Sequence, residues 1–449
     1  MHKFGFESYT FEPEVFLDID SVNKNAFLDL LKINSLHLSL AKFLRIDFSS
    51  MVNMKNLNEI CLECKIDYDQ DNESNYIEGL FPECLEKLSI MNFNIELSSF
   101  KHLKNLEYLE LIDIKDIVIR DPRPFDCFEK LTFLEITRSK VSKTCSELEI
   151  QMGPLGLKEL KINVDTKKCF EHFRVLFDNL CNLISFDSLF NKCQFDSVHI
   201  KPLRNLEELR ILVKSLKQNE LKELLYSLTK LRILEIAGIR IQGDIYLNLN
   251  NLEELAIFDS DLSEFSLKSD TFTNLTNLVR LELQRSNISQ IEPGAFKYLK
   301  RLKRLNLKAN KITSINRNAF EGLFNLEELD LSWNKITEID VRTFDSLNNL
   351  IKLLLTRFVF NPSNVDMIKT GLFMNLKKLK HLCLDLNGIR NINENLFQDC
   401  SSLEELDLSY NCFDKNEIRT GTTFNNLTNL KIFRNYGKLS NKIIVIPSI

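Results

Sequence analysis

Glycine and proline are scarce in this chain, with 12 Gly and 9 Pro among 449 residues. The shortage argues against long flexible linkers, which are rich in Gly, Ser or Pro, and no low-complexity segment stands out. A run of about 18 apolar residues, the length that a membrane-spanning helix needs, is also missing. The opening residues lack the apolar core of a secretory signal peptide. The sequence therefore predicts no membrane span and shows no leader.

The motifs of common enzymes are absent too. There is no G-x-S-x-G nucleophile motif, no P-loop and no G-x-G-x-x-G turn. The histidines lie far apart and form no H-E-x-x-H or H-x-x-x-H pair; they are His2, His37, His102, His172, His199 and His381. We therefore expect no enzyme, no cofactor and no metal site.

Cysteines are scattered along the chain instead of clustering at its ends, so they do not form a disulfide framework. Cys61 and Cys64 form the one C-x-x-C, but a metal or redox site would need a second pair or a neighbouring helix. We expect Cys61 to face outward from a strand and Cys64 to lie past its end. Cys193 and Cys400 replace apolar residues of the repeat described below and should be buried. Cys383 is expected to be a free thiol.

What the chain does have is 33 Phe and an ordinary globular balance, with 44% hydrophobic and 27% charged residues. That balance argues against wholesale disorder. The net charge of −5 gives no reason to expect a nucleic acid or an anionic membrane as a partner.

A segment of 24 residues occurs twice in nearly the same form. Residues 302–325 read LKRLNLKANKITSINRNAFEGLFN, and residues 326–349 read LEELDLSWNKITEIDVRTFDSLNN. The pattern L-x-x-L-x-L recurs at intervals of 21 to 29 residues, which indicates a solenoid of about seventeen repeats. Its clear starts are Leu252, Leu278, Leu302, Leu326, Leu350, Leu379 and Leu403; weaker starts are Ile33, Leu57, Leu85, Leu106, Leu131, Leu157, Leu183, Leu206, Leu231 and Leu430.

One repeat shows what its fixed residues do. Leu305 and Leu307 alternate around a polar residue, so one face of a short strand is buried. Asn310 follows where the chain leaves the strand, and a buried amide there can bond to the turn. Six residues before each start from Leu278 to Leu430 stands a Phe, which predicts a ladder of stacked rings; its members are Phe272, Phe296, Phe320, Phe344, Phe373, Phe397 and Phe424.

This spacing resembles the leucine-rich repeat family in its 24-residue form, L-x-x-L-x-L-x-x-N-x-I-x-x-I-x-x-x-x-F-x-x-L-x-x. The match is most regular over residues 252–433 and looser before them, where the Asn position is often replaced. The resemblance implies an α/β solenoid, a horseshoe with a concave parallel β-sheet and an irregular convex side. It places the solenoid at residues 33–433, between an N-terminal segment or irregular cap at 1–32 and a C-terminal segment at 434–449.

Members with such repeats include the ectodomains of Toll-type receptors, Slit, chaoptin and the small leucine-rich proteoglycans. The resemblance thus implies a non-enzymatic, protein-binding scaffold of an extracellular or cell-surface receptor or adhesion protein. Extracellular members usually have Cys-clustered caps and a signal peptide, and this chain shows neither. Either it is a truncated fragment of a secreted or membrane-tethered protein, or it is a cytoplasmic adaptor such as an F-box substrate arm. We favour the fragment, because 24-residue repeats with this Phe are typical of the extracellular members of the family. Residues 1–32 are also too short for an F-box.

The variable residues between the consensus leucines point outward and lie about 4.8 Å apart on adjacent strands. In these columns basic and acidic residues alternate, which fits a solvated salt-bridge ladder, a mixed-charge recognition surface, or both. A further column places Trp333 beside Arg357, residue types that binding interfaces favour. We predict a protein ligand on the concave face, with the partner-binding residues Arg304, Glu328, Asp330, Trp333, Lys352, Arg357 and Tyr410.

Two further features concern the surface of the repeats. Four sequons could carry N-glycans if the protein is secreted, at Asn72, Asn274, Asn287 and Asn426. The repeat from Leu350 to Leu379 is five residues longer than its neighbours, and Phe358 stands at its Asn position. We expect the extra residues, around NPSNVDMIK, to bulge from the turn side without breaking the sheet.

Overall fold

In the computed structural model the chain forms two compact units, Met1–Leu212 and Val213–Ile449, each described here by itself. The structure describes residues 15–19, 32–40, 48–64, 77, 81–114, 116–120, 125–139, 141–143, 156–164, 180–188, 203–212, 218–241, 249–264, 266–358, 368–413, 424, 426–437 and 440–445. No helix in this described part is long and apolar enough to cross a membrane.

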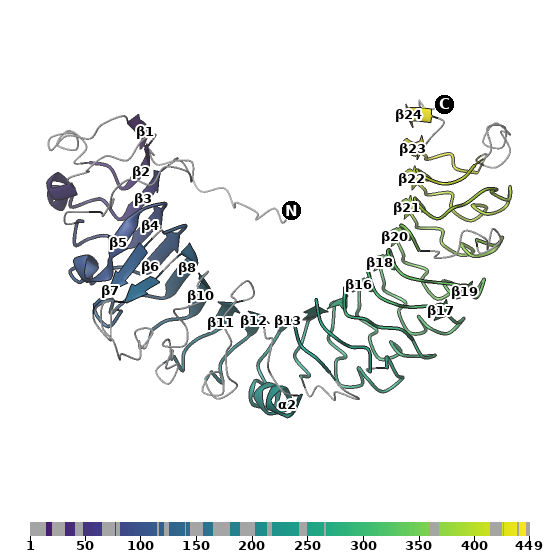
Figure 1. The fold of residues 1–449 in the computed structure, drawn as a ribbon, viewed down its shortest axis with the longest axis horizontal. Coiled ribbons are helices and arrows are strands. Elements are labelled where there is room, and N and C mark those ends of the chain that lie inside the picture. Colours follow the sequence, from purple (N-terminus) through teal and green to yellow (C-terminus); the bar gives the residue numbers. More distant parts are fainter. Residues whose placement is uncertain are drawn as a thin grey trace. The chain divides into compact units, whose positions relative to one another are not determined.

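The first unit is built on a parallel sheet whose strands follow one another along the chain, apart from three that form a small second sheet (Figure 1). The main strands are β1 (Val15–Ile19), β2 (Ser35–Leu40), β3 (Glu59–Cys64), β4 (Lys87–Met91), β6 (Tyr108–Ile112), β8 (Phe133–Ser139), β10 (Glu159–Val164), β11 (Ser185–Ser188) and β12 (Glu208–Leu212). The second sheet is β5 (Asn94–Glu96), β7 (Asp116–Ile119) and β9 (Val141–Lys143), and the 3-10 helices are η2 (Phe48–Asn53) and η3 (Leu97–Phe100).

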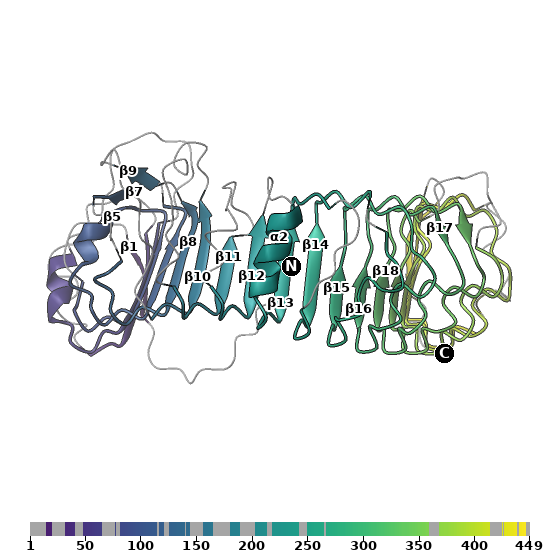
Figure 2. The same ribbon diagram turned by 90° about the horizontal axis from the view of Figure 1, so that it is seen from below.

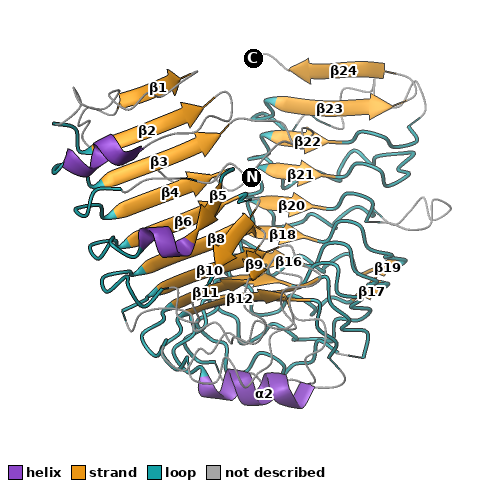
Figure 3. Cartoon of the chain, turned by 60° about the vertical axis from the view of Figure 1, so that its left-hand side comes forward, coloured by secondary structure: helices purple, strands orange, loops and turns teal. Residues whose placement is uncertain are grey.

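The second unit repeats this arrangement with shorter strands, which run side by side (Figure 2). They are β13 (Ile233–Ala237), β14 (Glu254–Phe258), β15 (Arg280–Glu282), β16 (Arg304–Asn306), β18 (Glu328–Asp330), β20 (Lys352–Leu354), β21 (His381–Cys383), β22 (Glu405–Asp407) and β23 (Ile432–Gly437). β24 (Ser440–Val445) turns back antiparallel to β23 (Figure 3), β17 (Ser314–Ile315) pairs with β19 (Glu338–Ile339), and α2 (Gln218–Ser227) precedes β13.

A strand begins two residues after every start found in the sequence, from β2 after Ile33 to β23 after Leu430. The predicted fold class, a leucine-rich repeat solenoid with a parallel sheet, is confirmed. Helix is sparse, because most connections on the side away from the strands are turns. β1 and β24 extend the sheet into the segments that the sequence analysis assigned to the two ends.

The core of the second unit is a stack of phenylalanine rings, as the register predicts. Neighbouring centroids from Phe272 to Phe424 lie 5.9 to 6.5 Å apart, and the ring planes are within 5° to 19° of parallel. Phe320, in the middle of the stack, has no exposed surface. Each ring is thus held between two others, so the stack ties consecutive repeats together.

The buried asparagines close the turns that follow the strands. The Oδ1 atom of Asn310 accepts hydrogen bonds from the backbone N–H groups of Ser286 and Ile288, at 3.0 and 3.1 Å. Its Nδ2 donates to the carbonyl groups of Leu283 and Leu307, at 2.7 and 2.9 Å. One amide therefore satisfies four backbone groups belonging to two adjacent repeats.

The longer repeat keeps its place in the sheet, because β20 and β21 pair in register from Lys352 and His381. Phe358 is buried at the Asn position, and its N–H donates to Oδ1 of Asn387 at 2.8 Å. The prediction that the insertion leaves the sheet intact is confirmed, whereas the bulge itself, around residues 359–367, lies outside the described residues.

One expectation about the cysteines is wrong. Cys64 is the last residue of β3 and is fully buried, because the strand runs two residues beyond the consensus length. Cys400 is buried and Cys383 is a free thiol, as predicted, while Cys193 lies outside the described residues.

Candidate functional site

The strands of the second unit line its concave side, so their outward side chains form an open surface (Figure 1). Three of the predicted residues meet there on consecutive strands, because β16, β18 and β20 pair in register. The carboxylate of Glu328 lies 3.5 Å from Nε of Arg304 and 3.6 Å from Nζ of Lys352. These side chains are 41% to 63% exposed, so each ion pair contributes only about 0–1 kcal/mol.

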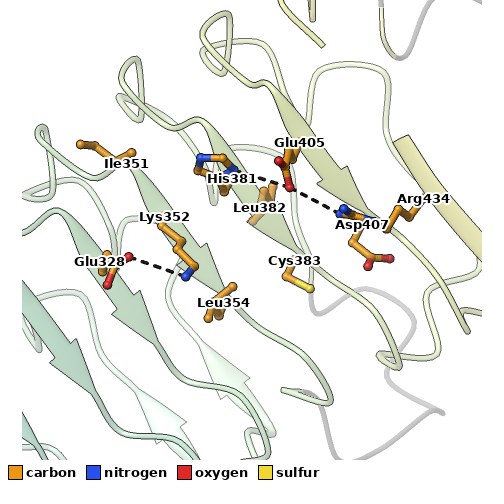
Figure 4. A pocket seen from close by; sticks show the side chains of 10 residues that line it. All are labelled: Glu328, Ile351, Lys352, Leu354, His381, Leu382, Cys383, Glu405, Asp407 and Arg434. Carbon is orange, nitrogen blue, oxygen red and sulfur yellow. Dashed lines mark hydrogen bonds and ion pairs between the residues drawn. The ribbon is translucent and has the colours of Figure 1, made fainter. Parts of the chain in front are cut away.

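A shallow depression of about 450 Å³ continues this surface from β18 to β23 (Figure 4). Glu405 lies between two nitrogen groups in it, 3.7 Å from Nδ1 of His381 and 3.5 Å from Nη1 of Arg434. Glu328, Lys352, Glu405 and Arg434 are therefore already ion-paired within the sheet, and Oδ1 of Asp407 accepts the N–H of Ser409 at 2.9 Å. Its lining residues are Glu328, Ile351, Lys352, Leu354, His381, Leu382, Cys383, Glu405, Asp407 and Arg434.

The thiol in the depression is not set up as a nucleophile. Burial raises the pKa of Cys383 to about 12, and its Sγ donates to Oδ1 of Asp385 at 3.0 Å. A thiol with such a pKa is neutral near pH 7, and nucleophilic chemistry needs the thiolate. Among the residues that the structure describes, no cluster of His, Cys, Asp and Glu could hold a metal ion.

Trp333 stands at the edge of the strand surface, where the chain leaves β18. Its backbone is left-handed, with φ of 59°, and this conformation turns the residue out of the strand direction. The indole is 44% exposed, and Cζ of Arg357 lies 4.9 Å from the ring centroid. Such a cation–π contact holds the ring in place while part of it remains open to solvent.

The same left-handed turn recurs at this position in the neighbouring repeats, seven residues after each start. It places an outward row along the edge of the second unit, whose members are Asp259, Arg285, Ala309, Trp333, Arg357, Leu386 and Tyr410. In this row Leu386 and Tyr410 are exposed as well.

The structure brings five of the predicted site residues into two groups and leaves two apart from them. Arg304, Glu328 and Lys352 form an ion-paired row, and Trp333 stacks with Arg357. Asp330 lies on the strand face, but its Oδ1 accepts the N–H of Ser332 at 2.8 Å. Tyr410 is 60% exposed and lies two repeats beyond Arg357, so the structure does not bring it to Trp333.

Sequence reasoning left out most of the depression. His381, Cys383, Glu405 and Asp407 occupy the same outward columns as the chosen residues, so their column position was the available signal. Arg434 occupies the column of Asp407 in the next repeat, but that repeat begins at the weaker start Leu430, so its signal was fainter.

The first unit carries an aromatic pair on its own strand face that the sequence analysis did not single out. The rings of Tyr108 and Phe133 are stacked with centroids 4.1 Å apart, and Nζ of Lys161 lies 5.0 Å from the Phe133 centroid. Burial and the neighbouring charges of Glu110 and Glu135 raise the pKa of the Tyr108 hydroxyl. This face combines stacked rings with carboxylates.

A family model described as "Leucine rich repeat" matches residues 250–312, 276–336, 300–357 and 360–413. No curated protein matches the sequence. Among solved structures, the LRR protein LIC12759 of Leptospira interrogans is similar, with a TM-score of 0.60, 20% identity and 92% of each chain covered. The TLR13–ssRNA13 complex is also similar, with a TM-score of 0.50, 19% identity, and 89% of this chain and 70% of that chain covered. At these identities the likeness shows the fold alone.

Proposed function

We propose that this chain, which is a leucine-rich repeat protein, is a non-enzymatic scaffold that binds a protein partner. The partner contacts the concave strand face of the second unit and the adjoining edge at Trp333. The observation that carries this proposal is the exposed indole held by Arg357, because Trp and Arg dominate the energetics of protein interfaces. The ion-paired row from Arg304 to Lys352 borders it and favours partners with complementary charge.

A protein is favoured over a nucleic acid as the partner. TLR13 has been crystallised with ssRNA13, but this chain has a net charge of −5, and a phosphate backbone is bound mainly by excess positive charge. On the strand face the basic side chains are matched by acidic ones, which leaves little net charge there for phosphates.

The proposed place of action is the cell exterior or cell surface, as part of a receptor or adhesion protein. Asn274 and Asn426 are exposed, and Asn287 is half-buried with its Nδ2 3.4 Å from Oδ1 of Asp261. Asn72 lies outside the described residues. After expression through a secretory pathway, deglycosylation should lower the mass of the peptides that contain Asn274 and Asn426. The alternative, a cytoplasmic adaptor, requires that none of these sites is glycosylated in native material.

Site-specific photo-crosslinking tests the binding proposal. A photoreactive phenylalanine analogue at position 333 should give an adduct with a partner from native extract, and excess unlabelled protein should suppress it. The same analogue at Phe324, which is 52% exposed just before the start Leu326, serves as the control. Adducts that form equally at both positions, or that a Trp333→Ala competitor suppresses as well as the native protein, would exclude this surface.

A further inference from the structure

The strand of the repeat that starts at Leu302, with the segments on either side of it, carries a one-sided charge. Residues 295–318 contain no Asp or Glu, and the basic residues among them are Lys297, Lys300, Arg301, Lys303, Arg304, Lys308, Lys311 and Arg317. The next repeat is rich in acidic residues, with Glu327, Glu328 and Asp330 in or beside its strand. A basic side chain here is therefore neutralised only where an acidic residue of the next repeat lies beside it.

At the beginning of the strand the basic side chains are neutralised. Nζ of Lys303 lies 2.9 Å from Glu327, and Nε of Arg304 lies 3.5 Å from Glu328. These pairs follow from the parallel register, which sets each residue opposite its counterpart in the next repeat.

Past the end of the strand the pairing stops. Lys308 and Lys311 are exposed, and neither makes an ion pair with any residue that the structure describes. Their counterparts in the next repeat are Ser332 and Lys335, which offer no carboxylate. In the preceding repeat the counterparts are Gln284 and Asn287, which are also uncharged. The positive charge at this edge is thus left for something outside the unit.

Trp333 lies next to these lysines. The N–H of Ala309 donates to the carbonyl of Ser332 at 2.8 Å, and the N–H of Trp333 donates to that of Thr356 at 2.8 Å. The indole therefore stands between the turn of Ala309 and that of Arg357. Arg357 covers one side of the ring, while the small side chain of Ala309 covers little on the other, which explains the exposed indole surface.

Asp330 and Asp385, which stand in or just after the strands of other repeats, have partners of their own. Oδ1 of Asp330 accepts the N–H of Ser332, and Oδ1 of Asp385 accepts the hydroxyl of Thr356 at 2.6 Å. Neither is ion-paired with Lys308 or Lys311. The edge consequently presents two unpaired ammonium groups, a guanidinium and an open indole.

We infer that the partner presents an acidic peptide segment that carries an apolar side chain. Its carboxylates meet Lys308, Lys311 and Arg357, and the apolar group packs on the open side of Trp333. This inference rests on the proposed function and specifies the chemistry of the partner. The ion pairs on the strand face are already formed, so attraction of the partner comes from the edge beyond the strands.

The test uses an eight-residue peptide, acetyl-EELEELEE-amide, and follows the fluorescence of Trp333, the single Trp of the chain. The peptide should change the emission saturably, and added salt should weaken its binding. Replacing Lys308 and Lys311 together by Gln should weaken binding about tenfold. Replacing Lys300 and Arg301 together by Gln removes the same charge from the turn before the strand and should change binding less than twofold.

Three controls decide the outcome. Equal binding of the neutral peptide acetyl-QQLQQLQQ-amide would overturn the inference, as would an equal loss in both double variants with unchanged circular dichroism. If an eight-nucleotide oligouridylate binds and the glutamate peptide does not, the partner at this edge is a nucleic acid and the inference is overturned. No response to the glutamate peptide, while crosslinking at position 333 persists, would reject the acidic partner and keep the proposed function.

Discussion

The eighth residue after the start differs between repeats of the two units. Four repeats of the second unit have Asn there, at positions 310, 334, 387 and 411, whereas Ser139 of the first unit is a serine, as are Ser260 and Ser286 of the second. In the second unit Asn310 satisfies four backbone groups there, whereas in the first unit Ser139 accepts the N–H of Ile114 at 3.0 Å and donates to the carbonyl of Thr137 at 2.8 Å. A hydroxyl has one hydrogen to donate and an amide has two. The amide therefore ties the turn both to its own strand, at Leu307, and to the preceding repeat, at Leu283, Ser286 and Ile288.

The rings of the two units differ in the same way. Phe272 to Phe424 form an unbroken parallel stack, while Phe81 and Phe100 of the first unit meet at 48° and Phe125 and Phe128 at 43°. Phe81 and Phe128 do not stand six residues before a start, so these two pairs join ring positions that the stack of the second unit does not use. The stack tolerates a longer repeat, because Phe344 and Phe373 have centroids 6.5 Å apart and planes within 7° of parallel across the five extra residues. We conclude that the amide and the stack each tie consecutive repeats together.

The largest effect should come from the stack. Phe320→Ala should lower the free energy of unfolding by about 3–5 kcal/mol, because it opens a cavity between Phe296 and Phe344. Lys311→Ala, at an exposed side chain, should change it by less than about 0.5 kcal/mol. Chemical denaturation followed by circular dichroism compares the two. Equal denaturation midpoints would contradict the assignment of Phe320 to the core of the stack.

The turns should give the next largest effect. Asn310→Ala leaves four backbone groups without their partner and should cost about 2–4 kcal/mol, whereas Ser139→Ala should cost about 1 kcal/mol. Hydrogen exchange of the amides of Ser286 and Ile288 measures the loss locally. A smaller loss for Asn310→Ala than for Ser139→Ala would break the comparison between the two kinds of repeat.

Much of this was predictable from the sequence. The positions of the strands followed from the leucine spacing, and the stack followed from the phenylalanine register, because both depend on regular local periods. The ends of the strands and the contents of the depression did not follow. β3 extends to Cys64, and Arg434 joins Glu405 through β23, whose start matches the consensus only weakly. The left-handed edge was hidden as well, because the residues that occupy it share no side-chain chemistry.

A smaller effect on stability is expected at the left-handed position, seven residues after each start. Gly238 has φ of 75° and Ala309 has φ of 56° at the same repeat position. A side chain with a Cβ is disfavoured in this conformation by about 1–2 kcal/mol. Gly238→Ala should therefore destabilise its repeat by about 1 kcal/mol, and Ala309→Gly should stabilise its repeat by about 0.5–1 kcal/mol. Thermal melts of both variants measure the signs, and a gain for Gly238→Ala would rule out this explanation.

A further prediction concerns the rate at which the cysteine thiols are alkylated, and it involves no change in stability. Burial raises the pKa of Cys383 to about 12 and also raises that of Cys61, so both remain protonated at pH 8. Cys412 and Cys181 are exposed and should be alkylated by iodoacetamide well before them. Peptide mass spectrometry at successive times ranks the four residues. Early labelling of Cys383 would contradict its protected position on the strand face.

Quenching of the Trp333 fluorescence by iodide and by caesium, at constant ionic strength, is the most direct test of the edge. It shows whether the edge is both open and positively charged. The 44% exposed indole should emit at long wavelength. The unpaired Lys308 and Lys311 should concentrate iodide and repel caesium, so iodide should quench several-fold more strongly. Substitution of both lysines by Gln should make the quenching constants of iodide and caesium more nearly equal. Short-wavelength emission that both ions leave unchanged, or stronger quenching by caesium, would contradict an exposed cationic edge and the binding surface built on it.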